Sequence, residues 1–355
     1  MRLSLVTGGC GFIGHHLVRL LATRGERVRV LDWRRPAADN GIFAGLPSGA
    51  VEFRQGDIAD PATVDAAVAG VSRVYHLAAN PNLWARDASV FERVNLGGTL
   101  NVLAAAERHR PERVVYTSTE SILAGLRGAA RGSAMIDEDI ALSVDDMPGP
   151  YCRSKFLAER AALDAAANGL PVVVVNPTLP IGPGDRLLTP PSRMLLDFLG
   201  GRTPAYLETA FNMIDVRDAA LGHILAAERG RTGQRYILGG ENLTMSGLLA
   251  LLAEISGRPV PRLRIPYWLA YAYSAVDEFV ADRITGKPPR APLTGVRLAR
   301  HAMHFDNSRA LAELGLQPRP LRRALTDAVA WFRNEGLLPE PANRCGAHPQ
   351  ARAGE

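Results

Sequence analysis

Short apolar runs alternate with stretches of helical periodicity through the first half of the chain. The runs are rich in valine and leucine and indicate buried strands, whereas the stretches between them repeat apolar residues every three or four positions. We predict strands at residues 3–7, 27–32, 51–55, 73–79, 113–119 and 172–175, and helices from about 13, at 61–69, 90–108 and 151–167. This alternation predicts an α/β fold of the Rossmann type, a doubly wound parallel sheet covered by helices on both faces.

The pattern loosens after Pro177, and residues 120–149 already look like a loop. Helices are predicted at about 192–199, 216–228, 246–255, 268–285 and 321–334, with a short strand at 234–238 that returns to the sheet. We therefore expect a dinucleotide-binding domain at residues 1–177, with returning segments near 212–240, and a smaller, mostly helical substrate domain at 178–338. The tail, residues 339–355, has no apolar period and is expected to be disordered.

A glycine-rich turn joins the first strand to the first helix. Gly8, Gly11 and Gly14 fit the pattern Gly-x-x-Gly-x-x-Gly. Such a turn lets a pyrophosphate approach the backbone closely, and the free N–H groups at the helix start then face the anion. The next strand ends at Asp32, 18 residues beyond Gly14, where an acid can accept hydrogen bonds from ribose hydroxyls. This context favours a dinucleotide site over a merely structural turn.

A tyrosine and a lysine stand four residues apart at the start of the helix predicted over 151–167. Tyr151 and Lys155 therefore share one helix face, after a hydroxyl cluster that ends at Thr119. A nearby ammonium and the positive ring of an oxidised nicotinamide would lower the pKa of the phenol. Tyr151 could then exchange a proton with a secondary alcohol or ketone while hydride moves, with Thr119 holding the same oxygen. The alternative is an ordinary surface pair.

Composition narrows the class of protein. Apolar residues make up 47% and charged residues 22% of the 355 positions, as in a globular protein. Cys10, Cys152 and Cys345 lie far apart, so neither a disulfide framework nor a metal site is expected, and a reducing cytoplasm fits. The net charge is +5, but 39 of the 41 basic residues are scattered arginines, so no nucleic-acid partner is expected. No signal peptide is expected either.

In combination these motifs resemble the extended short-chain dehydrogenases/reductases, the superfamily of NAD-dependent epimerases and dehydratases. The resemblance covers about residues 1–335 and rests on Thr-Gly-Gly-x-Gly-Phe-Ile-Gly at 7–14, Gly-Asp at 56–57, His-Leu-Ala-Ala at 76–79, Asn-x-x-Gly-Thr at 95–99, Thr-Ser-Thr at 117–119 and Tyr-x-x-x-Lys at 151–155. Residues 145–147, 154–159 and 236–242 are most similar to hopanoid-associated "sugar epimerases", which lie close to dihydroflavonol reductases and 3β-hydroxysteroid dehydrogenases.

The resemblance implies roles position by position. Thr119, Tyr151 and Lys155 would be catalytic. The residues that it implies for cofactor binding, besides Tyr151 and Lys155, are Gly8, Gly11, Phe12, Ile13, Gly14, Asp32, Arg34, Asp57, Ile58, Ala78, Ala79, Asn95, Thr117, Asn176 and Pro177. The cofactor would be NAD(H), because the charge of Asp32 repels a 2′-phosphate; Arg34 and Arg35 keep NADP(H) open. Asn80, Trp84, Glu120 and Phe211 are predicted to contact the substrate.

Departures from the family pattern concern the substrate. Sugar epimerases carry an arginine that binds a nucleotide diphosphate where this chain has Phe211, and Arg217 comes six residues later. We therefore expect a dehydrogenase or reductase that acts on a bulky, apolar, polycyclic isoprenoid such as a sterol or hopanoid. A nucleotide-sugar epimerase or dehydratase is the alternative, and a cofactor-binding regulatory protein without turnover is a third class, against which Tyr151 and Lys155 argue.

Two further expectations concern partners. The resembled family forms homodimers through the outer faces of the helices predicted at 90–108 and 151–167, which carry apolar residues on more than one face. Residues 265–276 form an aromatic, apolar stretch of 12 residues, too short for a transmembrane span of about 20. This stretch would be a core helix, or a wall of the substrate pocket that touches a membrane surface from the cytoplasm.

Overall fold

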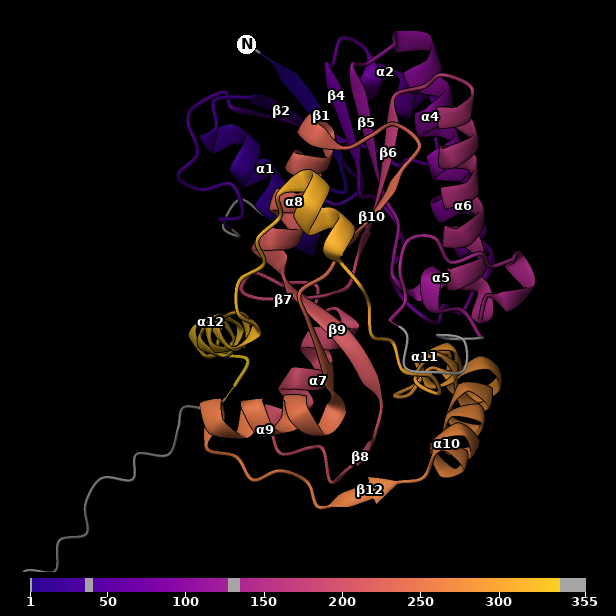
Figure 1. Ribbon diagram of the computed structural model, residues 1–355, viewed down its shortest axis with the longest axis vertical. Helices are drawn as coiled ribbons and strands as arrows, with labels where there is room; N and C mark the ends of the chain where they lie inside the picture. The colour runs from indigo at the N-terminus through magenta and orange to yellow at the C-terminus, as the bar shows by residue number, and fades with distance from the viewer. Residues whose placement is uncertain (1, 36–40, 127–134, 339–355) are drawn as a thin grey trace, which may run out of the picture.

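A seven-stranded parallel sheet forms the centre of the computed structural model, which describes residues 2–35, 41–126 and 135–338 (Figure 1). The predicted disorder of residues 339–355 lies outside the described residues. The strand order is β10-β6-β5-β4-β1-β2-β3, which confirms the predicted doubly wound fold. The strands are β1 (Leu3–Thr7), β2 (Arg27–Asp32), β3 (Val51–Gln55), β4 (Arg73–His76), β5 (Arg113–Thr117), β6 (Val172–Pro177) and β10 (Arg235–Leu238).

Helices cover both faces of this sheet (Figure 1). The first face carries α1 (Phe12–Thr23) and α8 (Val216–Arg229), and the second carries α2 (Pro61–Val68), α4 (Gly98–His109) and α6 (Gly149–Ala167). Neighbouring strand residues point to opposite faces of the sheet. Leu5 therefore packs against the helices on the second face, and Val6 packs against those on the first. Burial on both faces explains why the inner strand β6 begins with four consecutive valines, whereas the edge strand β3 is only partly buried and carries Glu52, Arg54 and Gln55.

The remaining elements, which we call the second domain, lie beyond the carboxyl ends of the seven strands (Figure 1). Its strands are β7 (Leu179–Ile181), β8 (Ala205–Leu207), β9 (Ala210–Asp215), β11 (Glu241–Thr244) and β12 (Leu263–Ile265). Its helices are α7 (Pro190–Leu199), α9 (Met245–Ser256), α10 (Tyr267–Val280), α11 (Leu293–Leu298) and α12 (Leu321–Asn334). The helices were largely predicted, but the five strands were not, because runs of three to six residues are too short to show a period.

Two predicted helices contain π-helical turns, and one predicted loop contains short helices. The helix expected at 90–108 is α3 (Ser89–Phe91), the π-helical η2 (Glu92–Gly97) and then α4. The helix expected at 268–285 is α10 followed by the π-helical η4 (Ala281–Thr285). The loop expected at 120–149 includes α5 (Ser121–Ala124) and the short η3 (Val144–Asp146). Two of these insertions, η2 and α5, lie beside the candidate site.

Candidate active site

The glycine turn between β1 and α1 is closed by contacts that only glycine permits. Gly8 has a φ of +70°, and a Cβ there would lie 2.8 Å from the backbone of Ala78. A Cβ on Gly14 would lie 2.1 Å from the Gly8 carbonyl oxygen. At Gly11 the same oxygen, 3.1 Å away, is the one atom near the Cβ position, so the turn is open on that side. The turn therefore fits a pyrophosphate that approaches the backbone.

Asp32 lies at the end of β2 and holds this turn. Its Oδ2 accepts a hydrogen bond from the Cys10 N–H at 3.0 Å, and its Oδ1 accepts one from the Arg34 N–H at 3.1 Å. The Arg34 guanidinium lies over the Trp33 ring, 4.3 Å from its centroid. Each carboxylate oxygen keeps a free lone pair, so Asp32 can still accept hydrogen bonds from ribose hydroxyls.

A buried chain of polar side chains crosses the sheet edge beside the turn. The Thr99 hydroxyl donates to the Asn95 carbonyl at 2.6 Å, so it can only accept from His76 Nε2 at 3.0 Å. His76 Nδ1 is then the acceptor for the Thr7 hydroxyl at 2.7 Å. Burial lowers the pKa of His76 to about 3, so the ring stays neutral. This chain fixes β1, β4 and η2 relative to one another.

Asn95 connects the loop after β4 to the helix that carries the predicted catalytic pair. Its Oδ1 accepts from the Asn80 N–H at 2.7 Å, and its Nδ2 donates to the Asn80 carbonyl at 3.2 Å and to Ser154 Oγ at 3.0 Å. Ser154 in turn donates to the Tyr151 carbonyl at 2.8 Å. Asn95 stands in η2, and π-helical turns are frequent at functional sites. The sequence argument named Asn95 but missed Ser154, which has no motif of its own.

The three predicted catalytic side chains come together between the end of β5 and the start of α6. Thr119, Tyr151 and Lys155 are all buried, and the Thr119 side chain acts on the Tyr151 phenol by lowering its pKa. Lys155 Nζ donates to the Thr117 carbonyl at 2.7 Å and lies 4.7 Å from the centroid of the Tyr116 ring. The chain thus assembles a hydroxyl, a phenol and an amine in one buried place, which suits proton exchange with a substrate oxygen.

Burial has the largest effect on the protonation of this group. It raises the pKa of Tyr151 above its usual value; the Glu120 carboxyl acts in the same direction, and the hydrogen bond to Thr119 opposes. Burial also lowers the pKa of Lys155 to about 7, against the Glu159 carboxylate. The expectation that the lysine would lower the phenol pKa is wrong for the protein alone, because burial prevails. The positive ring of a bound, oxidised nicotinamide would favour the phenolate.

Glu120 is a buried carboxyl beside Thr119. Its Oε2 accepts from the Thr119 hydroxyl at 3.1 Å and its Oε1 from the Ser121 hydroxyl at 3.4 Å. Burial raises its pKa to about 7, and the hydrogen bonds from Thr119 and Ser121 reduce the shift. None of the ion pairs within the described ranges involves Glu120. A carboxyl that titrates near neutrality next to a predicted catalytic hydroxyl is a functional candidate.

Thr117 and Asn176 support the group from neighbouring strands. His223 Nδ1 can only donate to the Ala219 carbonyl at 2.7 Å, so its Nε2 accepts from the Thr117 hydroxyl at 2.9 Å. Asn176 Nδ2 donates to the Thr119 carbonyl at 3.2 Å and to Glu159 at 2.8 Å. The buried Oδ1 of Asn176 has no hydrogen-bond partner within the described residues, which fits a ligand with a donor group at this sheet edge.

The remaining predicted residues divide between the cofactor edge and the second domain. Asp57 accepts from the Ala59 N–H at 2.9 Å. Trp84 Nε1 donates to Asp282 Oδ1 in η4 at 2.8 Å, so this side chain joins the two domains. Phe211 is 3% exposed and packs in the core of the second domain. This burial does not agree with the predicted contact between Phe211 and the substrate. Phe12, Ile58 and Pro177 are buried, and Ile13, Ala78 and Ala79 are half-buried.

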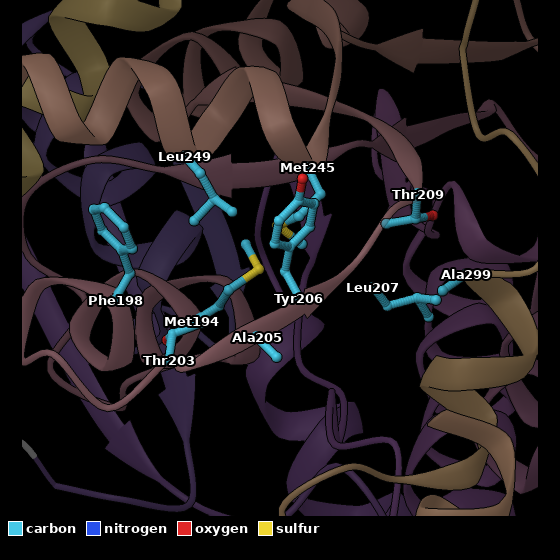
Figure 2. A pocket seen from close by; sticks show the side chains of 10 residues that line it. All are labelled: Met194, Phe198, Thr203, Ala205, Tyr206, Leu207, Thr209, Met245, Leu249 and Ala299. Atoms are coloured by element: carbon cyan, nitrogen blue, oxygen red, sulfur yellow. The ribbon is translucent and has the colours of Figure 1, made fainter. Parts of the chain in front are cut away.

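An apolar pocket of about 230 Å³ opens in the second domain (Figure 2). Figure 2 shows Leu249 and Met245 reaching into it from α9, with Met194 and Phe198 facing them. The full lining is Met194, Phe198, Thr203, Ala205, Tyr206, Leu207, Thr209, Met245, Leu249 and Ala299. None of these side chains is charged. Ala299 directly follows Leu298 of α11, and Leu298 packs in the same apolar cluster as Tyr151.

Arg217 does not face this pocket. Its Nε donates to Asp215 Oδ1 at 2.8 Å and its Nη2 to Asp327 Oδ2 at 2.7 Å. It lines a different hollow, of about 290 Å³, with His16 and Arg19 of α1. With two carboxylate partners already, it is not a free phosphate ligand for the apolar pocket. Across the described ranges no set of His, Cys, Asp and Glu side chains could hold a metal, and no helix could cross a membrane.

Similar proteins cover most of this chain. A protein from Synechocystis called putative dihydroflavonol 4-reductase is 40% identical over 337 residues, 94% of this chain and 95% of the relative. Sterol demethylase protein B from Methylococcus capsulatus is 35% identical over 337 residues, 94% of this chain and 99% of the relative. A dTDP-glucose 4,6-dehydratase from Streptomyces venezuelae, solved with NAD bound, matches with a TM-score of 0.76 and 26% identity over 95% of this chain and 99% of its own.

The model of the NAD dependent epimerase/dehydratase family matches residues 4–239. The match spans the whole glycine turn, η2, Tyr151, Lys155 and the sheet up to β10. The predicted resemblance is therefore confirmed, and the chain belongs to the NAD dependent epimerase/dehydratase family, a group of NAD-dependent enzymes within the extended short-chain dehydrogenases/reductases.

Proposed function

We propose that this protein transfers hydride between NAD(H) and a secondary alcohol or ketone of a bulky, polycyclic isoprenoid of the sterol or hopanoid type. The uncharged pocket in the second domain carries this proposal, because a pocket lined by methionine, leucine and aromatic side chains recognises apolar surface. The relative named sterol demethylase protein B supports the same substrate class.

The chemistry follows from the placement of three side chains. A bound nicotinamide supplies the hydride donor or acceptor. During oxidation the C–H bond of the alcohol breaks, and Tyr151 Oη takes the hydroxyl proton; during reduction it returns a proton to the ketone oxygen. Thr119 hydrogen-bonds the same substrate oxygen. Lys155 Nζ donates to the Thr117 carbonyl, and its remaining protons would be donors for the hydroxyls of a bound nicotinamide ribose.

Asp32 favours NAD(H) over NADP(H). Its carboxylate lies against the glycine turn, and the nearest arginine, Arg34, is stacked on Trp33. A 2′-phosphate would meet the negative charge of Asp32 before a free guanidinium. Titration with both cofactors tests this preference: tighter binding of NADP(H) would show that Arg34 or Arg35 turns toward the phosphate.

A nucleotide-sugar epimerase or dehydratase is the second candidate, favoured by the fold shared with the dTDP-glucose 4,6-dehydratase. Such an enzyme needs cationic partners for a diphosphate, and the apolar pocket has none in its lining. The deciding experiment is a side-by-side assay of sterol and hopanoid alcohols and ketones against UDP- and dTDP-sugars. Turnover of the nucleotide sugars alone would overturn the isoprenoid proposal.

The proposal includes a homodimer in the cytoplasm, in peripheral contact with membrane. Leu100 on α4 and Leu157 on α6 are 47% and 39% exposed, and these helices lie side by side on the outside of the sheet (Figure 1). A two-fold contact through them would bury both leucines in a four-helix interface. Light scattering at micromolar concentration tests it, and the mass of a monomer would contradict the dimer.

A further inference from the structure

The helix α10 and the following η4 present their apolar side chains to the outside. Trp268, Val276 and Phe279 are 69%, 64% and 60% exposed, and Ile284 is 73% exposed. The first three share one helix face, because residues eight and eleven positions apart return to the same side of an α-helix. A surface helix normally shows the reverse arrangement, with its apolar side against the core.

Polar contacts on the inner side hold α10 in this orientation. Asp277 Oδ2 accepts from the Ala291 N–H at 3.1 Å, and Glu278 Oε2 accepts from the Leu293 N–H at 2.7 Å. The Ser274 hydroxyl donates to the Ala291 carbonyl at 2.6 Å. The two acidic side chains of α10 thus bind the segment that leads into α11, and this contact leaves the apolar face of the helix pointing outward.

The segment that carries this face is rich in positive charge. Residues 262–300 contain seven basic side chains and three acidic ones, in a chain whose net charge is +5. The acidic residues are Asp277 and Glu278 and also Asp282, which accepts from Trp84. The basic ones are Arg262, Arg264, Arg283, Lys287, Arg290, Arg297 and Arg300, and no ion pair between described residues includes any of them.

We propose that the outer face of α10 and η4 is a docking surface for a membrane that contains anionic lipids. Exposed Trp, Tyr and Phe side chains suit the boundary between headgroups and acyl chains, and basic side chains around them are attracted to anionic headgroups. A second copy of this chain is the poorer occupant, because a two-fold contact would bring two basic surfaces together. The exposed side chains enter the lipid boundary and the arginines contact phosphates.

The role of this surface rests on the proposed function, because a membrane would be the source of an isoprenoid substrate. The inner side of α10 packs on α11, whose Leu298 belongs to the apolar cluster around Tyr151. Docking would therefore place the apolar side of the active site next to the bilayer, where sterols and hopanoids reside. Vesicle binding is measured without turnover, so a failure of docking and a failure of the substrate assignment are separate results.

The test is co-sedimentation of the full chain with vesicles of phosphatidylcholine alone or mixed with phosphatidylserine. We expect binding to the mixed vesicles that weakens with salt. Trp268→Ser with Phe279→Ser should weaken it by about tenfold or more through lost apolar burial, and Arg283→Glu with Lys287→Glu by a similar factor through reversed charge. The matched controls are Leu311→Ser, an apolar change elsewhere, and Arg323→Glu with Arg333→Glu on α12; each should bind like the unaltered chain.

Three results would overturn the proposal. The first is no sedimentation with the mixed vesicles, and the second is equal binding by the Trp268→Ser/Phe279→Ser variant and the unaltered chain. The third is a dimer in solution that the same double substitution converts to a monomer, without vesicle binding, which would assign the face to a second copy. Circular dichroism and thermal unfolding confirm that the surface variants are folded.

Discussion

The edge of the parallel sheet and the pocket of the second domain differ in the side chains that line them: the first is polar and the second is apolar. At the sheet edge a few polar atoms must stand in fixed places, and many of them are held by hydrogen bonds, such as those from Asn95 to Asn80 and Ser154. In the pocket the side chains are uncharged, and several are methionine or leucine. The first region can direct protons and the second can recognise area and shape.

The two regions also differ in how change should affect them. A polar site depends on single atoms, so the loss of one hydroxyl removes a step of the chemistry. An apolar pocket spreads its contribution over many weak contacts, so a substitution there shifts substrate binding and leaves the chemistry in place. The predictions below test this difference, beginning with the largest effect.

Replacing Tyr151 with phenylalanine removes the proposed proton-transfer group and little volume. We expect turnover to fall by about 10²-fold or more, while NAD(H) still binds, in line with the usual contribution of a general acid or base. Steady-state kinetics and cofactor titration measure the two quantities. Lys155→Met should impair both cofactor binding and turnover.

The matched control is Tyr75→Phe, which removes the hydroxyl of another buried tyrosine, on β4, whose oxygen has no hydrogen-bond partner in the described part of the chain. Its activity should stay near that of the unaltered enzyme. Near-normal turnover of Tyr151→Phe would reject the assignment of Tyr151 as the proton-transfer group.

A charge placed in the pocket should act on binding alone. Met194 lines the pocket and is half-buried, so Met194→Lys keeps a long side chain but brings an ammonium against the apolar substrate. We expect KM for the isoprenoid substrate to rise by about tenfold, with kcat changed much less. Met194→Leu, which conserves volume, is the control and should differ little. A fall in kcat with unchanged KM would contradict the role of this pocket in substrate binding.

The polar region could be predicted from the sequence because its motifs are local. The turn from Gly8 to Gly14, the acid at Asp32 and the spacing of Tyr151 and Lys155 lie within single strand-to-helix or helical units. The π-helical turn around Asn95 could not, because its period differs too little from that of an α-helix over six residues.

The pocket escaped prediction for a different reason. Its lining comes from residues between 194 and 299, brought together by strands as short as three residues and by tertiary packing. Phe211 illustrates the limit. The sequence marks Phe211 as a departure from the family pattern, but the phenylalanine fills the core of the second domain and is not among the residues that line the pocket. The absence of a guanidinium at that position is what bears on the substrate.

The smallest predicted effect concerns Glu120. It tests whether the protonation of this one carboxyl changes the activity of the polar region. While Glu120 is ionised, the Thr119 hydroxyl donates to it and cannot donate to the substrate oxygen. Protonated Glu120 can donate to Thr119 instead and release that hydroxyl for the substrate. Since burial raises the pKa of Glu120 to about 7, this contribution is present below pH 7 and lost as the pH rises above it.

We therefore expect ketone reduction to fall by a few-fold between about pH 6 and pH 8 beyond the change due to other groups. Glu120→Gln keeps a donor for Thr119 at every pH and should flatten this step, whereas Glu120→Ala should lower activity without restoring a flat profile. The Glu120 carboxyl itself acts on two titratable side chains of α6, Tyr151 and Cys152; burial raises the pKa of both phenol and thiol, so neither should titrate in this range. An unchanged pH step in Glu120→Gln would assign it to another group, with Lys155, whose pKa is also about 7, as the next to replace.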